Sequence, residues 1–287
     1  MSTVAPLITS PTLGELEVLR KLVRERSGIV LSQEKQYLIE SRLGPLMRTR
    51  GIRSWTDLVI QLQQTATSAG LTKAVVEAMT TNETFFFRDQ YPFEALQRHI
   101  LPKLIAARAQ LKALDIWCAA SSSGQEPYSI AMILREYFSS TLQGWKVRII
   151  ATDISSDMIA RCQAGVYSAV EMGRGLTPSQ VARHFVKSGD LWTIHESLRS
   201  MVEFRVVNLL DPWPHASKMD IVFCRNVLIY FDDPTKKKIL GRIHALLRTD
   251  GYLFLGGAET TISLDDRFER ANLDRAGAFT LKPPLPA

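Results

Sequence analysis

The sequence predicts an α/β protein with a mostly parallel sheet, a small helical domain before it and an antiparallel insertion within it. After residue 93, short apolar runs alternate with amphipathic helical segments, which is typical of strands covered on both faces. Residues 13–79 show only helical patterns, and residues 166–201 interrupt the alternation with short segments suited to antiparallel pairing. We therefore expect domains at 1–79 and 94–287, a linker at 80–93 and an inserted β-subdomain at about 166–201.

The N-terminal segment predicts four helices. Ser32 is the expected cap of the second helix and Gly51 its end, because serine favours N-caps and glycine favours C-caps. Leu38, Leu43 and Leu46 are expected to face inward from this helix. The expected helices cover residues 13–27, 33–50, 55–62 and 72–79.

The segment at 111–133 organises the predicted sheet. Residues 111–118 indicate a buried strand, 119–124 a turn of small residues, and 127–136 a helix whose first turn suits Pro127. α/β folds hold nucleotide-like ligands beyond such strand ends. The turn could also be a plain connection, because the chain contains neither G-x-G-x-x-G nor a P-loop.

Polar residues also follow three later strands. They are Asp153 after residues 146–152, Asn208-Leu209 after 202–207 and Arg225-Asn226 after 219–224. Carboxyl ends of parallel strands share one sheet edge, so these positions predict a ligand site. Asp153 could hold ribose hydroxyls, or it could only cap the next helix. The remaining expected elements are helices at 93–108, 155–164 and 235–247, a turn at 250–251, a strand at 252–255 and an antiparallel pair within 268–282.

The linker combines three phenylalanines with polar residues. Phe85 to Phe87 could simply pack at the domain junction. Asn82, Thr84 and Arg88 are polar groups on this apolar segment, which is expected to pass beside the strand ends. They are therefore candidates for the same site.

The charge of the chain is concentrated near its start. Residues 20–53 hold nine Lys and Arg against three Glu, while the whole chain carries a net +6. Such a segment could dock on nucleic acid, an acidic protein surface or anionic lipid, or could be a solvated face without a partner. No signal peptide or membrane span is evident, so a cytoplasmic location is expected. Three scattered cysteines indicate reduced core thiols, and five histidines without ligand spacing predict no metal site.

Four segments carry distinctive motifs: T-T-N-E-T-F-F-F-R at 80–88, A-A-S-S-S-G-Q-E-P-Y-S at 119–129, A-T-D-I at 151–154 and F-C-R-N-V-L-I-Y-F-D at 223–232. In this order they resemble the CheR-type chemotaxis receptor methyltransferases over roughly residues 15–280. The resemblance implies a class I methyltransferase fold that uses S-adenosylmethionine and releases S-adenosylhomocysteine. It also implies methyl transfer to glutamate carboxylates of receptors during sensory adaptation.

The resemblance assigns roles to individual residues. The positions that match cofactor contacts are Asn82, Thr84, Arg88, Glu126, Asp153, Asn208, Leu209, Arg225 and Asn226. Among these, Glu126 matches a contact to the methionine portion and Asp153 a contact to the ribose. Arg88 and Tyr230 match residues nearest the transferred methyl. Arg88 could instead bind only the cofactor carboxylate or Asp89, and the Tyr230 ring could only pack against the site wall.

Two departures from the family pattern affect these expectations. Gln125 stands where many members carry a second glutamate, but Glu126 is retained, so we expect cofactor binding to survive. The loop at 187–192 is shorter than in members that bind a receptor pentapeptide, so we expect methylation without that tether. The basic segment at 20–53 would dock a monomeric enzyme on acidic receptor helices.

Two other functions stay open at the level of sequence. A nucleic-acid methyltransferase would also use a basic surface. Against it, no Asn/Asp-Pro-Pro-Tyr follows the strand at 219–224, and no Pro-Cys nucleophile is present. A non-catalytic scaffold that binds S-adenosylmethionine is the other alternative.

Overall fold

The computed structural model describes residues 10–64, 68–213, 217–273 and 275–283, and the chain forms two compact units. Unit 1 comprises residues 1–81 and 230–232, and unit 2 comprises residues 82–229 and 233–287. Residues 82–93 of the expected linker therefore group with unit 2.

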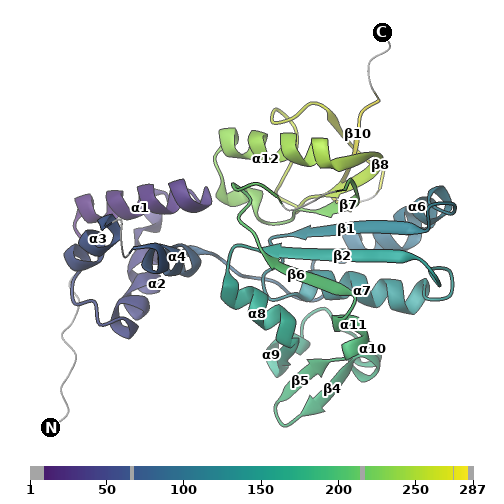
Figure 1. Cartoon of the computed structure of the whole chain (residues 1–287), viewed down its shortest axis with the longest axis horizontal. Coiled ribbons are helices and arrows are strands. Elements are labelled where there is room, and N and C mark those ends of the chain that lie inside the picture. The colour runs from purple at the N-terminus through teal and green to yellow at the C-terminus, as the bar shows by residue number, and fades with distance from the viewer. Residues whose placement is uncertain (1–9, 65–67, 214–216, 274, 284–287) are drawn as a thin grey trace. The chain divides into compact units, whose positions relative to one another are not determined.

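Unit 1 is helical in its described part (Figure 1). A capping box between Thr12 and Glu15 begins its first helix, and Gly28, with φ of 78°, ends it. The Ser54 hydroxyl accepts a hydrogen bond from the Asp57 N–H and caps α3. The helices are α1 (Leu13–Ser27), the 3-10 turn η1 (Gln33–Lys35), α2 (Gln36–Thr49), α3 (Trp55–Gln63) and α4 (Ala69–Met79).

The second helix differs from its prediction. Ser32 makes no side-chain cap, because a 3-10 turn precedes α2 and moves its start to Gln36. The buried stripe consists of Ile39, Leu43 and Met47, while Leu38 and Leu46 are only half-buried. A spacing of four residues keeps that stripe on one face of the helix.

Unit 2 is built on a seven-stranded sheet in the order β6-β2-β1-β7-β8-β10-β9. The five strands from β6 to β8 are parallel, and β10 and β9 close the sheet with antiparallel pairings, as expected. Helices α7 and α8 pack against β2 and β6, and Figure 1 shows α12 on the other side of the sheet. The strands are β1 (Ala113–Ala119), β2 (Lys146–Asp153), β6 (Val202–Val206), β7 (Met219–Phe223), β8 (Leu247–Phe254), β9 (Phe268–Arg270) and β10 (Ala278–Leu281). The helices are α5 (Tyr91–Ala95), the π-helical η2 (Leu96–Ile100), α6 (Leu101–Ala107), α7 (Gln125–Tyr137), α8 (Ser156–Ala164) and α12 (Asp233–Leu246).

The expected insertion contains a separate antiparallel sheet in the order β3-β5-β4. Tyr167, Phe185 and Trp192 point to one face, where Tyr167 and Phe185 are buried. The elements are β3 (Val166–Ser168), α9 (Ala169–Met172), α10 (Pro178–His184), β4 (Phe185–Ser188), β5 (Leu191–Ile194) and α11 (Glu196–Arg199).

The turn expected at residues 250–251 lies instead within β8, which starts at Leu247. The β7–β8 register shifts between Met219 and Ile221, and this irregularity absorbs the turn residues. Gly251 passes so close to β7 that a Cβ there would lie 2.8 Å from the Asp220 carbonyl oxygen. A glycine is therefore required for strand pairing at this point.

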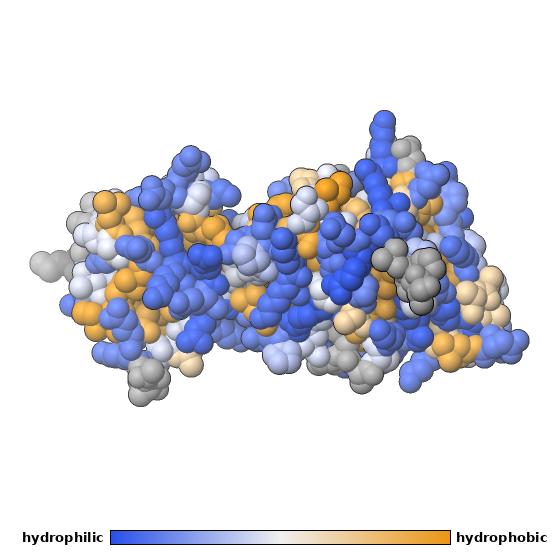
Figure 2. Space-filling view, turned by 90° about the horizontal axis from the view of Figure 1, so that it is seen from above, coloured by the Kyte–Doolittle hydropathy of each residue, from blue (hydrophilic) through white to orange (hydrophobic). Residues whose placement is uncertain are grey.

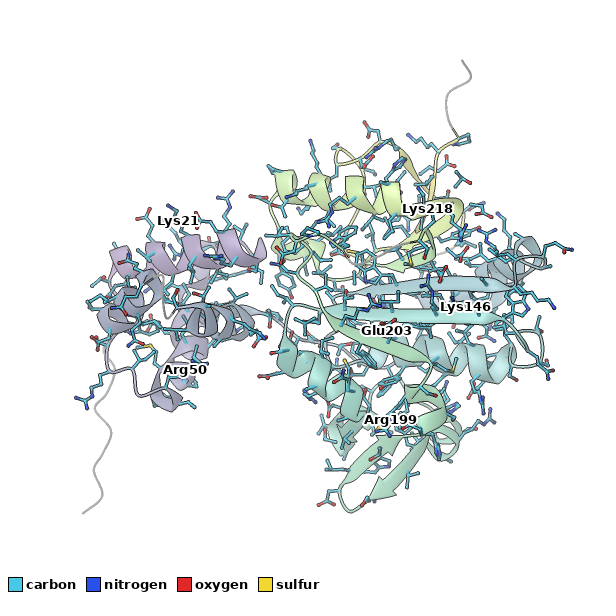
Figure 3. The ribbon with its side chains drawn as sticks, viewed as in Figure 1. Lys21, Arg50, Lys146, Arg199, Glu203 and Lys218 are labelled. Atoms are coloured by element: carbon cyan, nitrogen blue, oxygen red, sulfur yellow. The ribbon has the colours of Figure 1, made fainter. Side chains whose placement is uncertain are left out.

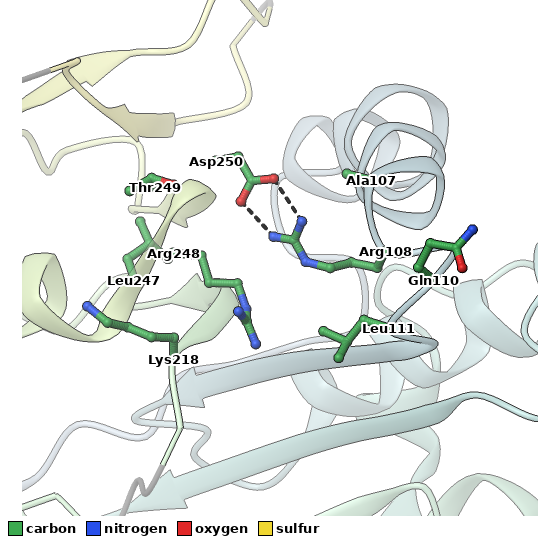
Figure 4. A pocket seen from close by; sticks show the side chains of 9 residues that line it. All are labelled: Ala107, Arg108, Gln110, Leu111, Lys218, Leu247, Arg248, Thr249 and Asp250. Atoms are coloured by element: carbon green, nitrogen blue, oxygen red, sulfur yellow. Dashed lines mark hydrogen bonds and ion pairs between the residues drawn. The ribbon is translucent and has the colours of Figure 1, made fainter.

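Figure 4 shows an ionic cluster at the amino ends of the parallel strands, beside an open pocket of about 670 Å³. Arg108 forms two hydrogen bonds with Asp250 and a third, of 2.8 Å, with the buried carboxylate of Asp220. Asp220 also accepts the Asp115 N–H. Burial raises the pKa of Asp220, whereas the Arg108 hydrogen bond lowers the pKa of Asp250. The cluster thus joins α6 to β1, β7 and β8.

Polar residues are prominent on the surface, and the cysteines lie in the core. Figure 2 shows hydrophilic residues over most of one face, with separate hydrophobic patches. Cys118, Cys162 and Cys224 are free and buried, and burial raises the pKa of each thiol. Within the described residues, no helix has both the length and the apolar character needed to cross a bilayer.

Candidate active site

Five parallel strands place polar residues at one edge of the sheet of unit 2. The sequence predicted four of these strand ends, and the strand order confirms that they share an edge. The residues at this edge are Ser121 to Gly124 after β1, Asp153 at the end of β2, Asn208 after β6, Arg225 and Asn226 after β7, and Glu259 after β8.

The turn after β1 has a strained backbone. Ala120 and Ser122 adopt φ values of 59° and 50°, and Gly124 adopts 97°. Left-handed conformations of non-glycine residues cluster at functional sites, where the surrounding structure enforces them. Here the Ser122 N–H donates to Asp153, and the Cys162 thiol and Tyr167 hydroxyl donate to the carbonyls of Ser122 and Ser123.

Asp153 fixes this turn rather than capping α8. Its Oδ2 accepts the Ser122 N–H at 2.8 Å and its Oδ1 accepts the Ser155 N–H at 2.9 Å. The cap itself is the Ser155 hydroxyl, which accepts the Met158 N–H. A carboxylate oxygen has two lone pairs, so these bonds are compatible with a further hydroxyl donor.

Arg225 joins three segments inside unit 2. Its side chain is 1% exposed and donates to Glu126 at 3.0 Å, to the Asp89 carboxylate at 2.7 Å and to the Arg88 carbonyl at 3.0 Å. Burial raises the pKa of Glu126, and the nearby Arg225 charge acts in the opposite direction. Gln125, next to Glu126, is buried, and its side-chain oxygen accepts a hydrogen bond from the Ser123 hydroxyl. It therefore supports the turn after β1.

The segment at 82–90 is anchored beside this turn. The Ser122 hydroxyl donates to the Asn82 carbonyl at 2.9 Å, and the Phe87 N–H donates to the Ser129 hydroxyl. Phe87, Asp89 and Gln90 all have positive φ. Phe86 is fully buried against Tyr167 and Phe185, and Phe87 packs on Phe93.

The other candidate residues are less tightly grouped. Arg88 donates to the Glu83 carbonyl at 2.6 Å, and Asp89, the alternative partner, is paired with Arg225. Thr84 is half-buried. Asn208 accepts the Leu210 N–H, and Leu209 is buried. Tyr230 lies in η3 (Leu228–Tyr230) and groups with unit 1, where its carbonyl accepts the Val30 N–H at 2.8 Å.

Sequence reasoning missed Glu259 and Tyr167. Glu259 accepts three backbone N–H groups after β7 and the Gly256 N–H after β8, and Tyr167 supports the turn after β1 from the insertion. A glutamate just beyond the Gly256-Gly257 pair that follows β8 was an available signal, because the end of that strand shares the same edge. Nothing in the sequence indicated Tyr167.

The chemistry of these groups fits a nucleoside cofactor with an amino-acid chain. The Glu126 carboxylate could hold an ammonium group, and Asp153 could accept ribose hydroxyls. Side-chain amides of Asn82, Asn208 and Asn226 could bind a carboxylate or a base edge. Among the described residues, no group of three or more His, Cys, Asp or Glu is arranged to hold a metal ion.

The fold and the strand-end site define a class I, S-adenosylmethionine-dependent methyltransferase. The chain belongs to the CheR methyltransferase family: residues 82–276 match the CheR methyltransferase, SAM binding domain, and residues 14–80 match the CheR methyltransferase, all-alpha domain. These matches confirm the predicted family, fold and cofactor.

Three relatives show how far the similarity extends. The chain is 46% identical over 259 residues to Chemotaxis protein methyltransferase 1 of Pseudomonas aeruginosa, covering 89% of this chain and 93% of that one. It is 45% identical to Chemotaxis protein methyltransferase Cher2 of Pseudomonas putida, with coverage of 89% and 93%. It is 40% identical over 280 residues to Chemotaxis protein methyltransferase of Vibrio parahaemolyticus, with coverage of 96% and 100%.

Proposed function

We propose that this protein methylates glutamate side chains of chemotaxis receptors in the cytoplasm and acts as a monomer. The relatives named chemotaxis protein methyltransferases support the substrate class. The observation that carries the reaction type is the site itself, which combines Arg88, Arg225 and carboxylates, with no histidine among its described residues. A glutamate carboxylate, with a reference pKa near 4.3, is already ionised at pH 7 and needs no general base.

In this proposal the residues of the strand ends and linker hold the cofactor. S-adenosylmethionine supplies a sulfonium-bound methyl group that is activated for displacement. Arg88 holds the acceptor carboxylate by charge-assisted hydrogen bonds, and Tyr230 orients it. Alignment and removal of water supply the rate enhancement. We expect Tyr230→Phe to lower kcat while cofactor affinity stays unchanged; weakened cofactor binding would point to a packing role.

The basic segment of unit 1 supports docking on an acidic receptor surface. Arg42 donates to the Met79 and Thr80 carbonyls at the end of α4 and is structural. Arg48, Arg50 and Arg53 are exposed, and Figure 3 labels Arg50 just after α2. These three cations are exposed and lie close together in the sequence, so they are available to glutamate-rich helices.

A charge-reversal pair tests the docking. Replacing Arg48, Arg50 and Arg53 with Glu should raise KM for receptor at low salt and leave cofactor affinity unchanged. The matched control replaces Arg98, Lys146 and Arg270, which are exposed in unit 2, with Glu. Equal KM values for the two triple variants would remove the docking proposal.

The hairpin of the small sheet supports methylation without a tether. Only Gly189-Asp190 separates paired Ser188 and Leu191, and Gly189 takes a φ of 59°. We propose that this short turn lacks the surface for a receptor pentapeptide. Calorimetric titration with the isolated pentapeptide should give no heat of binding, whereas tight binding would overturn this part.

The acceptor class can be tested directly. Methyl-labelled S-adenosylmethionine is incubated with the enzyme and receptor-containing membranes, and samples are then digested with protease or nuclease. We expect protease, not nuclease, to make the label soluble. Label released by nuclease would favour the nucleic-acid methyltransferase suggested by the basic segment. Cofactor binding without any label transfer would favour a scaffold.

A further inference from the structure

Glu259 binds four backbone N–H groups with one carboxylate. Its Oε2 accepts from Asn226 at 2.8 Å and from Gly256 at 2.6 Å, and its Oε1 accepts from Val227 at 2.9 Å and Ile229 at 3.2 Å. Hydrogen bonds to an ionised acceptor are roughly twice as strong as neutral ones. Glu259, in the turn that follows the neighbouring strand β8, therefore fixes the backbone that follows β7.

The segment that Glu259 fixes adopts a conformation it would not favour alone. Asn226 has a φ of 58°, in the left-handed region that L-residues rarely occupy. Its side chain lies over Gly256, where a Cβ would meet Asn226 Oδ1 at 2.6 Å and the Asn226 backbone nitrogen at 2.9 Å. Gly256 leaves the space for Asn226, and Glu259 holds its N–H, so two residues of one turn determine where the Asn226 amide points.

We propose that Glu259 is a positioning residue for cofactor binding, which acts by holding Asn226 in its left-handed conformation. This inference rests on the proposed function, in which Asn226 contacts S-adenosylmethionine. Both carboxylate oxygens are needed as acceptors, because each accepts two N–H groups. A glutamine would turn an NH₂ group toward two of those donors and leave them unsatisfied.

The test is a double-mutant cycle on affinity for S-adenosylhomocysteine, measured by calorimetry at neutral pH. The variants are Glu259→Gln, Asn226→Ala and the double variant, with Glu269→Gln as an exposed control on β9. We expect Glu259→Gln and Asn226→Ala each to weaken binding about tenfold. The double variant should be no weaker than the weaker single variant, because both act on one contact.

A second pair avoids any change of charge. Gly256→Ala should weaken cofactor binding like Glu259→Gln, whereas Gly257→Ala, whose Cβ would meet nothing within 4 Å, should match the native protein. Circular dichroism confirms that each variant is folded. Additive losses in the cycle, or a lower Tm for Glu259→Gln and Gly256→Ala with native cofactor affinity, would overturn the positioning role. If Asn226→Ala binds normally, the proposed cofactor contact fails and the positioning role fails with it.

Discussion

Arg225 reaches Glu126 on α7 through one guanidinium nitrogen and Asp89 through the other, at 3.0 and 2.7 Å. In the Arg225–Glu126 ion pair the arginine side chain is almost fully buried. Each buried charge is therefore stabilised mainly by its partner. Arg225 thus links the segment after β7 to α7 and to the segment ahead of α5.

Removing this arginine should destabilise the protein. Arg225→Met leaves the Glu126 carboxylate buried without its cation, and we expect a loss of about 3–5 kcal/mol in the free energy of unfolding. Arg225→Lys should lose less, because an ammonium keeps the charge but cannot reach all three acceptors. Urea unfolding measures the free energy of unfolding of both variants, and Arg98→Met, at an exposed position, is the control. A native stability for Arg225→Met would contradict this assignment.

Cofactor affinity should depend on pH through Glu126. Burial raises the pKa of Glu126 above its ordinary value of 4.5 in the free protein, and a bound ammonium would lower it. Protonation therefore competes with binding as the pH falls through the raised pKa, and affinity for S-adenosylhomocysteine should decrease there. Glu126→Gln should bind weakly with a flatter pH profile. Calorimetry across mildly acidic pH measures this affinity. If Glu126→Gln showed the same pH dependence of affinity as the native protein, Glu126 would not be its origin.

A methyl group at Gly175 should disturb the segment at 82–90. Gly175 has a φ of 85°, and a Cβ there would lie 1.7 Å from the Phe86 carbonyl oxygen. We expect Gly175→Ala to lower both Tm and methyl-transfer activity. Gly173→Ala is the matched control, because its Cβ would make an ordinary contact of 3.4 Å. Equal activities of the two variants would show that the contact is unimportant.

The Tyr167 hydroxyl should matter for cofactor binding although it lies in the inserted subdomain. It donates to the Ser123 carbonyl at 3.0 Å, and its ring packs on Phe86. Tyr167→Phe keeps the ring and removes one hydrogen bond, so cofactor affinity should fall by about 2- to 10-fold. The control is Tyr137→Phe, which changes an exposed ring at the end of α7. An unchanged affinity would limit Tyr167 to packing.

The cluster at the amino ends of the strands should affect stability alone. Arg108→Met removes one hydrogen-bonding partner of buried Asp220, which keeps Arg248 at 3.2 Å, and the partner of Asp250, so it should cost about 2–3 kcal/mol in the free energy of unfolding. Cofactor affinity, measured where the variant is folded, should be native because the cluster lies at the opposite edge of the sheet. A selective loss of affinity would contradict that separation.

Strand ends were predictable because apolar runs of five to eight residues are bounded by polar residues that share one edge of a parallel sheet. Contacts that depend on tertiary packing could not be predicted from the sequence. The hydrogen bond from the Asn226 N–H to Glu259 spans 33 residues, and no side-chain pattern predicts which backbone group a carboxylate will contact. The same applies to Ile39, which replaces Leu38 in the buried stripe because a 3-10 turn delays α2.

We propose that the product of the reaction is a carboxyl methyl ester. Receptor labelled by the native enzyme and methyl-labelled S-adenosylmethionine is treated briefly with alkali, and the volatile fraction is collected. We predict release of the label as methanol, because esters hydrolyse under conditions that leave methylated amines intact. Label that stays on the protein after alkali would contradict glutamate methylation and would require a different acceptor.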